Sequence, residues 1–138
     1  MQTPLISILV PFKNTESYIV ECLDSIVQQT YSHWELIIID DGSSDASYQL
    51  VQNYANSDAR VHLLSNTGNG IIEALRTGYK LAKGTFVTRM DSDDVMALNK
   101  LEQMQQSLVT RGNGHLALGN VQYFSKTAER PNKQALIV

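Results

Sequence analysis

Short apolar runs alternate with amphipathic segments along most of the chain. The apolar runs are rich in β-branched side chains, which is typical of strands buried on both faces of a sheet. They occupy residues 5–10, 34–39, 61–64 and 85–89, and Pro11 is predicted to stop the first of them. Between these runs, residues 15–29 and 45–56 have the apolar spacing of a helix with one buried side. A third helix follows a glycine-rich turn and carries Ile71, Ile72, Leu75, Tyr79 and Ala82.

The last part of the chain predicts one more helix and two more strands. The helix ends near Gly112, and one side of it would carry Leu98, Leu101, Met104 and Leu108. Residues 115–121 resemble a strand, and residues 135–138 resemble the start of another. We expect one domain over residues 1–138, in which residues 125–138 form a poorly ordered polar loop and apolar end. That apolar end leads us to expect that the chain was cut inside a larger domain.

The β-α-β-α-β-α-β order predicts an α/β fold, a three-layer sandwich with a mainly parallel sheet joined by right-handed crossovers. In such sheets ligands bind in the crevice at the carboxyl ends of the strands. Three polar sequences follow predicted strands, at residues 11–14, 40–43 and 91–94. We therefore expect these three sequences to line one site.

The sequence Asp91-Ser92-Asp93-Asp94 places three carboxylates within four residues. Two carboxylates about 5 Å apart repel by roughly 3 kcal/mol at an effective dielectric constant near 20, so a cation or several N–H donors should gather there. One alternative is a capped helix start with Arg89 as the counter-ion, because Arg89 and Asp91 share a strand face. A helix–loop–helix calcium loop fails because Val95 and Met96 occupy positions that need a ligand and a glycine. A magnesium or manganese ion shared with a diphosphate remains.

The other strand ends carry weaker signals. Asp40-Asp41-Gly42-Ser43 is compatible with a plain turn, and equally with a carboxylate that accepts from a base N–H or a ribose hydroxyl. Lys13 is assigned no role. The turn after the first strand contains no glycine, which excludes a P-loop and a dinucleotide-binding fingerprint. The sequence Gly68-Asn69-Gly70 lacks the third glycine and is better interpreted as a turn.

Composition narrows the class of protein. The chain has 43% apolar and 18% charged residues, and no apolar run approaches the roughly 18 residues that a membrane span needs. With a net charge of −3 and no basic stripe, nucleic acid is not an expected partner. The single cysteine, Cys22, lies on the apolar stripe of the first helix and is expected in the core. The N-terminus lacks the pattern of a secretory signal, so we expect a cytoplasmic protein.

Several motifs in the right order resemble the family 2 glycosyltransferases, nucleotide-sugar-dependent enzymes with the GT-A fold. The similarity covers residues 4–124. It rests on the opening strand at residues 4–14, on residues 25–31 followed by 34–45, and on residues 74–84 followed by Arg89-Met-Asp-Ser-Asp-Asp94, which resembles the D-x-D motif of the family. Each block is weak alone, and the ordered set is specific.

The resemblance implies a role for each matching residue. Pro11, Phe12 and Asp41 would line the base, with Asp40 supporting the pocket. Asp91 and Ser92 would approach the ribose or diphosphate, and Asp93 would bind the Mn²⁺ or Mg²⁺ that bridges the diphosphate oxygens. The donor would be a nucleotide sugar, in first place a UDP-sugar, and the acceptor a saccharide or lipid-linked hydroxyl. The implied transfer inverts the sugar and belongs to cell-envelope polysaccharide synthesis, at the inner periphery of the membrane in the full-length protein.

Three departures from the family pattern limit these expectations. Arg76 stands where asparagine is common, and Leu98 where proline usually follows the acidic cluster. The catalytic base of the family lies beyond the matched region, so we do not expect the base in this chain. We expect the chain to carry donor binding only. Apolar surface exposed by the cut would favour a homodimer. A non-catalytic nucleotide-binding or interaction module of the same fold remains the alternative, followed by a nucleotidyltransferase, against which the missing glycine-rich loop argues.

Overall fold

A four-stranded sheet forms the centre of the protein. The computed structural model describes residues 3–112, 114–122 and 134–136. The strands are β1 (Ile6–Phe12), β2 (Trp34–Asp40), β3 (Val61–Ser65) and β4 (Phe86–Arg89), in the order β3-β2-β1-β4. All neighbouring strands of this sheet are parallel, which confirms the predicted topology.

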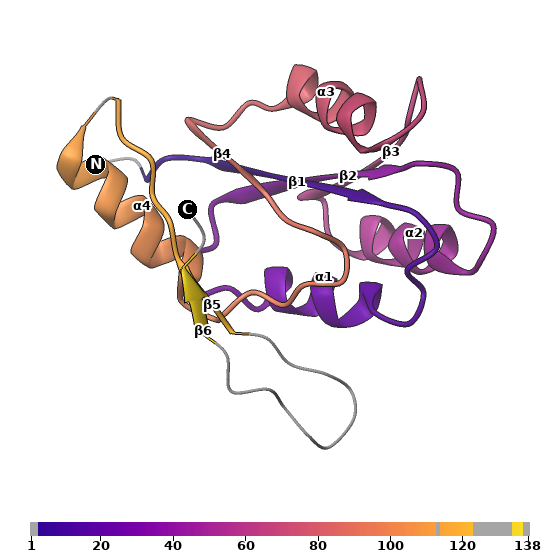
Figure 1. Ribbon diagram of the computed structural model, residues 1–138, viewed down its shortest axis with the longest axis horizontal. Helices are drawn as coiled ribbons and strands as arrows, with labels where there is room; N and C mark the ends of the chain where they lie inside the picture. The colour runs from indigo at the N-terminus through magenta and orange to yellow at the C-terminus, as the bar shows by residue number, and fades with distance from the viewer. Residues whose placement is uncertain (1–2, 113, 123–133, 137–138) are drawn as a thin grey trace.

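Helices cover both faces of the sheet, so the predicted three-layer α/β arrangement is confirmed. Helices α1 (Ile19–Val27) and α2 (Ser47–Ser57) lie on one face, and α3 (Ile71–Leu81) lies on the other (Figure 1). Helix α4 (Lys100–Arg111) lies at one end of the molecule, where its first turn is tied to the end of α1. There the Leu101 N–H donates to Gln29 Oε1 over 3.2 Å, and the Thr30 N–H donates to the Leu98 carbonyl over 2.9 Å.

The central strands are buried on both faces because successive side chains point to opposite sides. Ile8 and Val10 pack with the apolar stripe of α1, whereas Leu9 packs with Ile37, Ile39 and Ala74 under α3. Cys22 is fully buried in the first of these clusters, as predicted. None of the helices in the described part of the chain combines the length and apolar character that spanning a bilayer requires.

Helix α3 lies unusually close to the sheet. A Cβ atom on Gly78 would come within 2.8 Å of Ile39 Cδ1, so a larger residue here would have to displace that buried side chain. The small residues Ala74 and Gly78 therefore face the sheet, while Ile71, Ile72 and Tyr79 are more than half exposed. Leu75 packs against the apolar cluster under α3, while the large apolar side chains of Ile71, Ile72 and Tyr79 lie on the outer side of the helix.

Two predicted strand boundaries were wrong. Strand β1 continues through Pro11, which lies opposite Ile39 of β2. Proline is tolerated because β4 pairs only as far as Leu9, so the strand has a free edge beyond that point. The predicted strand over 115–121 shrinks to β5 (Asn120–Gln122), because residues 115–119 have no strand partner among the described residues.

Strand β5 pairs antiparallel with β6 (Gln134–Leu136), outside the main sheet. The strand predicted from residue 135 onward is thus present in part. Residues 137–138 and 125–133, which include the predicted polar loop, lie outside the described residues.

A buried polar link ties three strands together at the edge of the sheet opposite the carboxyl ends. The Ser7 hydroxyl donates to Glu35 Oε1 over 2.7 Å and accepts from the Gly84 N–H over 2.8 Å. The Lys83 N–H also donates to Glu35 Oε1 over 2.7 Å. A Cβ atom on Gly84 would lie 2.6 Å from the Ser7 nitrogen, so only glycine fits this crossing. The link fixes where β4 begins.

Candidate functional site

A cleft of about 320 Å³ opens at the carboxyl edge of the parallel sheet, where the topology predicts a ligand site. Four segments contribute to it: the end of β1 with its loop, the loop after β2, the start of α3, and the end of β4 with its loop. Its lining residues are Pro11, Phe12, Lys13, Thr15, Asp41, Ile71, Arg89, Asp91, Ser92 and Asp93.

Six of the seven residues singled out from the sequence line this cleft, and Asp40 does not. Asp40 is buried, and its Oδ1 accepts the Ser43 N–H over 3.0 Å, so it shapes the turn after β2 from below. Sequence reasoning gave Lys13 no role and considered Arg89 only as a counter-ion, yet both line the cleft, as do Thr15 and Ile71. A lysine and an arginine flanking predicted anion-binding turns were a usable signal for two of these four.

The loops after β1 and β2 interlock along the rim. The Asn14 side chain, in a left-handed backbone conformation with φ of 51°, accepts the Ser44 N–H over 2.8 Å. The Thr15 N–H donates to Ser47 Oγ over 2.8 Å. The hydrogen bond from Ser47, with further backbone donors, lowers the pKa of Asp45. The two loops therefore form one rigid unit, although about thirty residues separate them in the sequence.

Thr15 adds an unsatisfied group to the lining. Its Oγ1 is buried and has no hydrogen-bond partner in the described part of the chain. A buried hydroxyl without a partner costs on the order of 1–3 kcal/mol.

The turn after β3 holds the side chain of Asp41 in place. Its Oδ1 accepts from Asn66 Nδ2 over 2.8 Å and from the Gly70 N–H over 3.0 Å. Its own N–H donates to the Phe12 carbonyl over 2.9 Å. Gly70 has φ of 89° and leads directly into α3, whose first residue, Ile71, lines the cleft.

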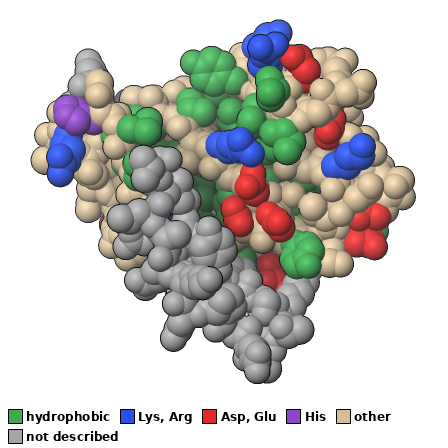
Figure 2. Space-filling view, in the orientation of Figure 1, with side chains coloured by type: hydrophobic (Ala, Val, Ile, Leu, Met, Phe, Trp, Pro, Cys, Tyr) green, Lys and Arg blue, Asp and Glu red, His purple; other side chains and the backbone are tan. Residues whose placement is uncertain are grey.

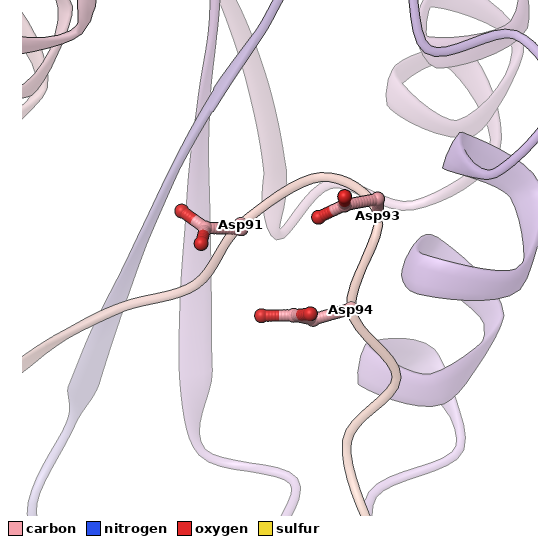
Figure 3. A group of neighbouring side chains, drawn as sticks. All are labelled: Asp91, Asp93 and Asp94. Carbon is pink, nitrogen blue, oxygen red and sulfur yellow. The ribbon is translucent and has the colours of Figure 1, made fainter. Parts of the chain in front are cut away.

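The acidic cluster Asp91, Asp93 and Asp94 lies in the loop after β4. One carboxylate oxygen from each residue falls within 4.8 Å of the others. Figure 3 shows the three carboxylates projecting on the same side of the loop. Figure 2 shows acidic side chains gathered near the middle of one face, beside a basic side chain.

The electrostatics of this cluster are unfavourable without a cation. Arg89 Nη2 lies 2.9 Å from Asp91 Oδ1, which confirms the predicted counter-ion, and it forms the only ion pair of the cluster among the described residues. Desolvation, with repulsion from Asp93 and Asp91, raises the pKa of Asp94. Burial and the three carboxylates also raise the pKa of Cys22, which lies behind the loop, to about 12.

The alternative interpretation of the acidic cluster as a capped helix start, with Asp94 at that start, was wrong. Helix α4 begins at Lys100 with Asn99 before it, so Asp94 precedes the helix by a full loop segment. Leu98, predicted on the helix, also lies before it and is 57% exposed. In the loop before the helix, the Met96 N–H donates to the buried Ser25 Oγ over 3.0 Å.

Comparisons with known proteins agree with this architecture. The family model described as glycosyl transferase family 2 matches residues 7–136. The chain is 37% identical over 129 residues to UDP-Glc:alpha-D-GlcNAc-diphosphoundecaprenol beta-1,3-glucosyltransferase WfgD of Escherichia coli, which covers 93% of this chain and 50% of that protein. Across the curated relatives compared, the chain spans from 17% to 50% of their length.

Two solved structures show the same fold. The S. aureus TarS 1-349 structure in complex with UDP-GlcNAc is 26% identical, with a TM-score of 0.70, over 88% of this chain and 38% of that one. The mannosyltransferase PcManGT from Pyrobaculum calidifontis, in complex with GDP-Man and Mn²⁺, is 25% identical with a TM-score of 0.70, over 88% of this chain and 36% of that one. A family match over nearly the whole chain, on a parallel sheet with its cleft at the carboxyl edge, shows that this chain belongs to glycosyl transferase family 2.

Proposed function

We propose that this chain holds the nucleotide-sugar donor of a glycosyltransferase, which transfers the sugar to an acceptor hydroxyl with inversion at the anomeric carbon. The observation that carries the proposal is a single cleft lined by Asp41, which follows β2, and by Asp91 and Asp93, which follow β4. Strand β1 lies between those two strands, so the two acidic positions flank it. A nucleoside diphosphate would place its base on the Asp41 side of β1 and its diphosphate on the side of Asp91 and Asp93.

The nucleoside would lie along β1. Pro11 and Phe12 supply apolar surface to the cleft, and Asp41 supplies a carboxylate for a base or ribose donor. Asp40 supports this wall through its bond to the Ser43 N–H. Asp91 and Ser92 line the cleft where a ribose or diphosphate would follow.

The acidic cluster fits a hard divalent ion, because three carboxylates supply oxygen ligands and their oxygens fall within 4.8 Å of each other. Asp93 would hold Mn²⁺ or Mg²⁺, with Asp91 and Asp94 within reach. When bound, such an ion offsets negative charge on the departing diphosphate. Lys13 and Arg89, which line the same cleft, attract that anion as well.

The relatives support the proposed donor class and acceptor. TarS has been solved with UDP-GlcNAc, and the name of WfgD specifies a UDP-Glc donor and a diphosphoundecaprenol-linked acceptor. We extend a UDP-sugar donor and a saccharide or lipid-linked acceptor to this protein, within cell-envelope polysaccharide synthesis at the cytoplasmic periphery of the membrane. The catalytic base would come from a part of the full-length protein outside this chain.

Titration calorimetry with UDP, GDP and dTDP, each with and without Mn²⁺, tests donor binding. We expect UDP to bind most tightly and to require Mn²⁺, and we expect Asp93→Ala to lose the metal-dependent part. Asp58→Ala is the matched control, since Asp58 precedes β3 at the opposite edge of the sheet and does not line the cleft. Binding that is unchanged by Mn²⁺ or by Asp93→Ala would contradict the proposal.

The non-catalytic alternative is separated by an activity measurement on the full-length protein. Transfer of the sugar from UDP-sugar to a lipid-linked saccharide, detected by mass spectrometry of the product, supports the enzyme. Donor binding with no transfer to any acceptor, and no hydrolysis, supports a binding module.

A further inference from the structure

Asn66, in the turn over residues 66–70, makes hydrogen bonds through both its backbone and its side chain. One of these bonds goes to Asp41, which lines the cleft. The Asn66 N–H donates to the Asp40 carbonyl over 2.8 Å. Its Nδ2 donates both to Asp41 Oδ1, over 2.8 Å, and to the Gly70 carbonyl, over 3.2 Å. Its Oδ1 accepts the Gly68 N–H over 3.2 Å. Asn66 is thus fixed in place, and it fixes Asp41.

These bonds occupy one oxygen of Asp41 and leave the other to a ligand. Oδ1 accepts from both Asn66 Nδ2 and the Gly70 N–H, and the backbone N–H of Asp41 is bonded to Phe12. No donor to Oδ2 occurs within the described residues, although Asp41 lines the cleft. An aspartate carboxylate can only accept hydrogen bonds, so Oδ2 needs a donor from the ligand.

A fixed carboxylate oxygen that can only accept selects among nucleobases. Uracil, thymine and guanine carry a ring N–H on the edge that pairs with another base, whereas cytosine and adenine carry an acceptor nitrogen there. A buried or half-buried acceptor left facing another acceptor is costly, so discrimination of about tenfold or more is expected from one such contact.

The same turn also places an apolar wall. The Gly70 carbonyl is held by Asn66, and Ile71 follows it at the mouth of the cleft with 53% of its surface exposed. Because Gly70 has φ of 89°, a conformation that other residues adopt only with strain, the position of Ile71 depends on this turn. One asparagine therefore sets both the polar contact and the apolar edge.

We propose that Asn66 is a positioning residue for base recognition: it holds Asp41 and, through Gly70, Ile71 so that the cleft accepts a base with a ring N–H, uracil in the UDP donor. This rests on the proposed function, because it assumes that the cleft takes a nucleoside diphosphate. It assigns a role to the Gly68-Asn69-Gly70 turn, which sequence reasoning interpreted as a plain turn.

Calorimetry on four variants, with three probes in the presence of Mn²⁺, tests the role of Asn66. The probes are UDP, CDP, which lacks the ring N–H, and inorganic pyrophosphate, which lacks the base. For Asn66→Ala we expect UDP affinity to fall about tenfold, the preference for UDP over CDP to disappear, and pyrophosphate affinity to stay within about twofold. Asn69→Ala, in the same turn and with no side-chain hydrogen bond described, is the matched control and should keep all three affinities. In an Asp41→Asn background, Asn66→Ala should cost less UDP affinity than it does in the wild-type chain, because the contact through Asp41 is already lost.

The outcomes separate this inference from the proposed function. A wild-type chain that binds neither UDP nor pyrophosphate with Mn²⁺ overturns both. A wild-type chain that binds UDP, while Asn66→Ala keeps the wild-type preference for UDP over CDP, overturns only the role of Asn66. An equal loss for all three probes in Asn66→Ala shows a general structural effect and also overturns it.

Discussion

Asp41 and the acidic cluster after β4 are carboxylates on one cleft that are built in opposite ways. Asp41 gives one oxygen to two N–H donors of its own chain. Asp91, Asp93 and Asp94 crowd together with a single arginine as ion-pair partner among the described residues. The first arrangement satisfies one carboxylate oxygen before any ligand arrives, and the second leaves charge that a cation would satisfy. The difference indicates that Asp41 is positioned to recognise the shape of a ligand, whereas the acidic cluster binds a charged one.

The largest expected effect is the stabilisation of the protein by Mn²⁺ and UDP bound at the acidic cluster. Saturating UDP and Mn²⁺, at about 100 times the dissociation constant, should raise the free energy of unfolding by about 2.7 kcal/mol, because ligand binds only the folded chain. Thermal denaturation with Mn²⁺ and UDP, against the same protein in EDTA, measures it. Asp93→Asn should remove most of this shift, and a full shift in that variant would break the comparison.

The matched control for this shift is Asp58→Asn. Asp58 pairs with Arg60 over 2.8 Å, just before β3, so its loss should lower the stability of the free protein. Asp58 does not line the cleft, and the difference between the ligand-bound protein and the protein in EDTA should therefore stay at its wild-type value. A reduced shift in this control would show that the ligands stabilise the protein through something other than the cluster.

Removing Asp41 should destabilise the protein even without ligand. Asp41→Ala leaves the Gly70 N–H and one N–H of Asn66 Nδ2 without an acceptor, and we expect a loss of about 1–3 kcal/mol in the free energy of unfolding. Asp93→Ala in EDTA should cost nothing, because no hydrogen bond to Asp93 is described and its charge is repelled. Urea denaturation of both variants compares them directly. Equal losses would show that the two carboxylates do not differ as described.

Arg89 should matter little to stability and more to the ion. Its pair with Asp91 is exposed on both sides, so Arg89→Gln should change the free energy of unfolding by less than about 1 kcal/mol. Removing a positive charge from the cluster should at the same time raise affinity for Mn²⁺ by about two- to fivefold. Calorimetry with Mn²⁺ alone measures this, and Arg76→Gln on the outer surface of α3 is the control. A fall in Mn²⁺ affinity would contradict the view of Arg89 as a competitor of the ion.

The smallest expected effect comes from Asp94. Its raised pKa means that folding favours the protonated form, so the ionised form present at neutral pH destabilises the folded state. Asp94→Asn in EDTA should therefore raise the free energy of unfolding by about a few tenths of a kcal/mol at pH 7. The value is small because the side chain is exposed and screened by solvent. As pH falls through the raised pKa, wild-type Asp94 takes up its proton and the gain should vanish. Thermal denaturation from pH 7 to pH 4 follows it, and a gain that grows at low pH would reverse the assignment.

Periodic patterns predicted the fold well because they report burial. The central strands of the parallel sheet are buried on both faces, and the order of the elements indicated where the polar strand ends would meet. Asp41, Asp91 and Asp93 could thus be placed on one site from the sequence. The end of β1 at Pro11 was predicted wrongly because proline is tolerated there only through the short reach of β4, which no local pattern records.

The loop contacts of the site could not be predicted for a physical reason. Asn66 meets Asp41 only because β3 lies beside β2, and the side chain that it bonds is 25 residues away. Asp94 resembled a helix start because aspartate is common there, but a side-chain acceptor, Ser25 Oγ, takes the Met96 N–H and the helix begins later. Such hydrogen bonds exist only once the fold has assembled, whereas the spacing of apolar residues can be seen in the sequence itself.

The link between Ser7, Glu35 and Gly84 also bears on the order of folding. β1 pairs with β2 across a short crossover, whereas β4 pairs with β1 only after Ile6 meets Phe86, a much longer chain closure. Longer closures cost more entropy and tend to form later. We expect β4 to join last, guided by the Gly84 N–H on Ser7, so that the cluster-bearing loop is assembled in the final step. A folding chain would then acquire its affinity for a metal ion only after the rest of its sheet is complete.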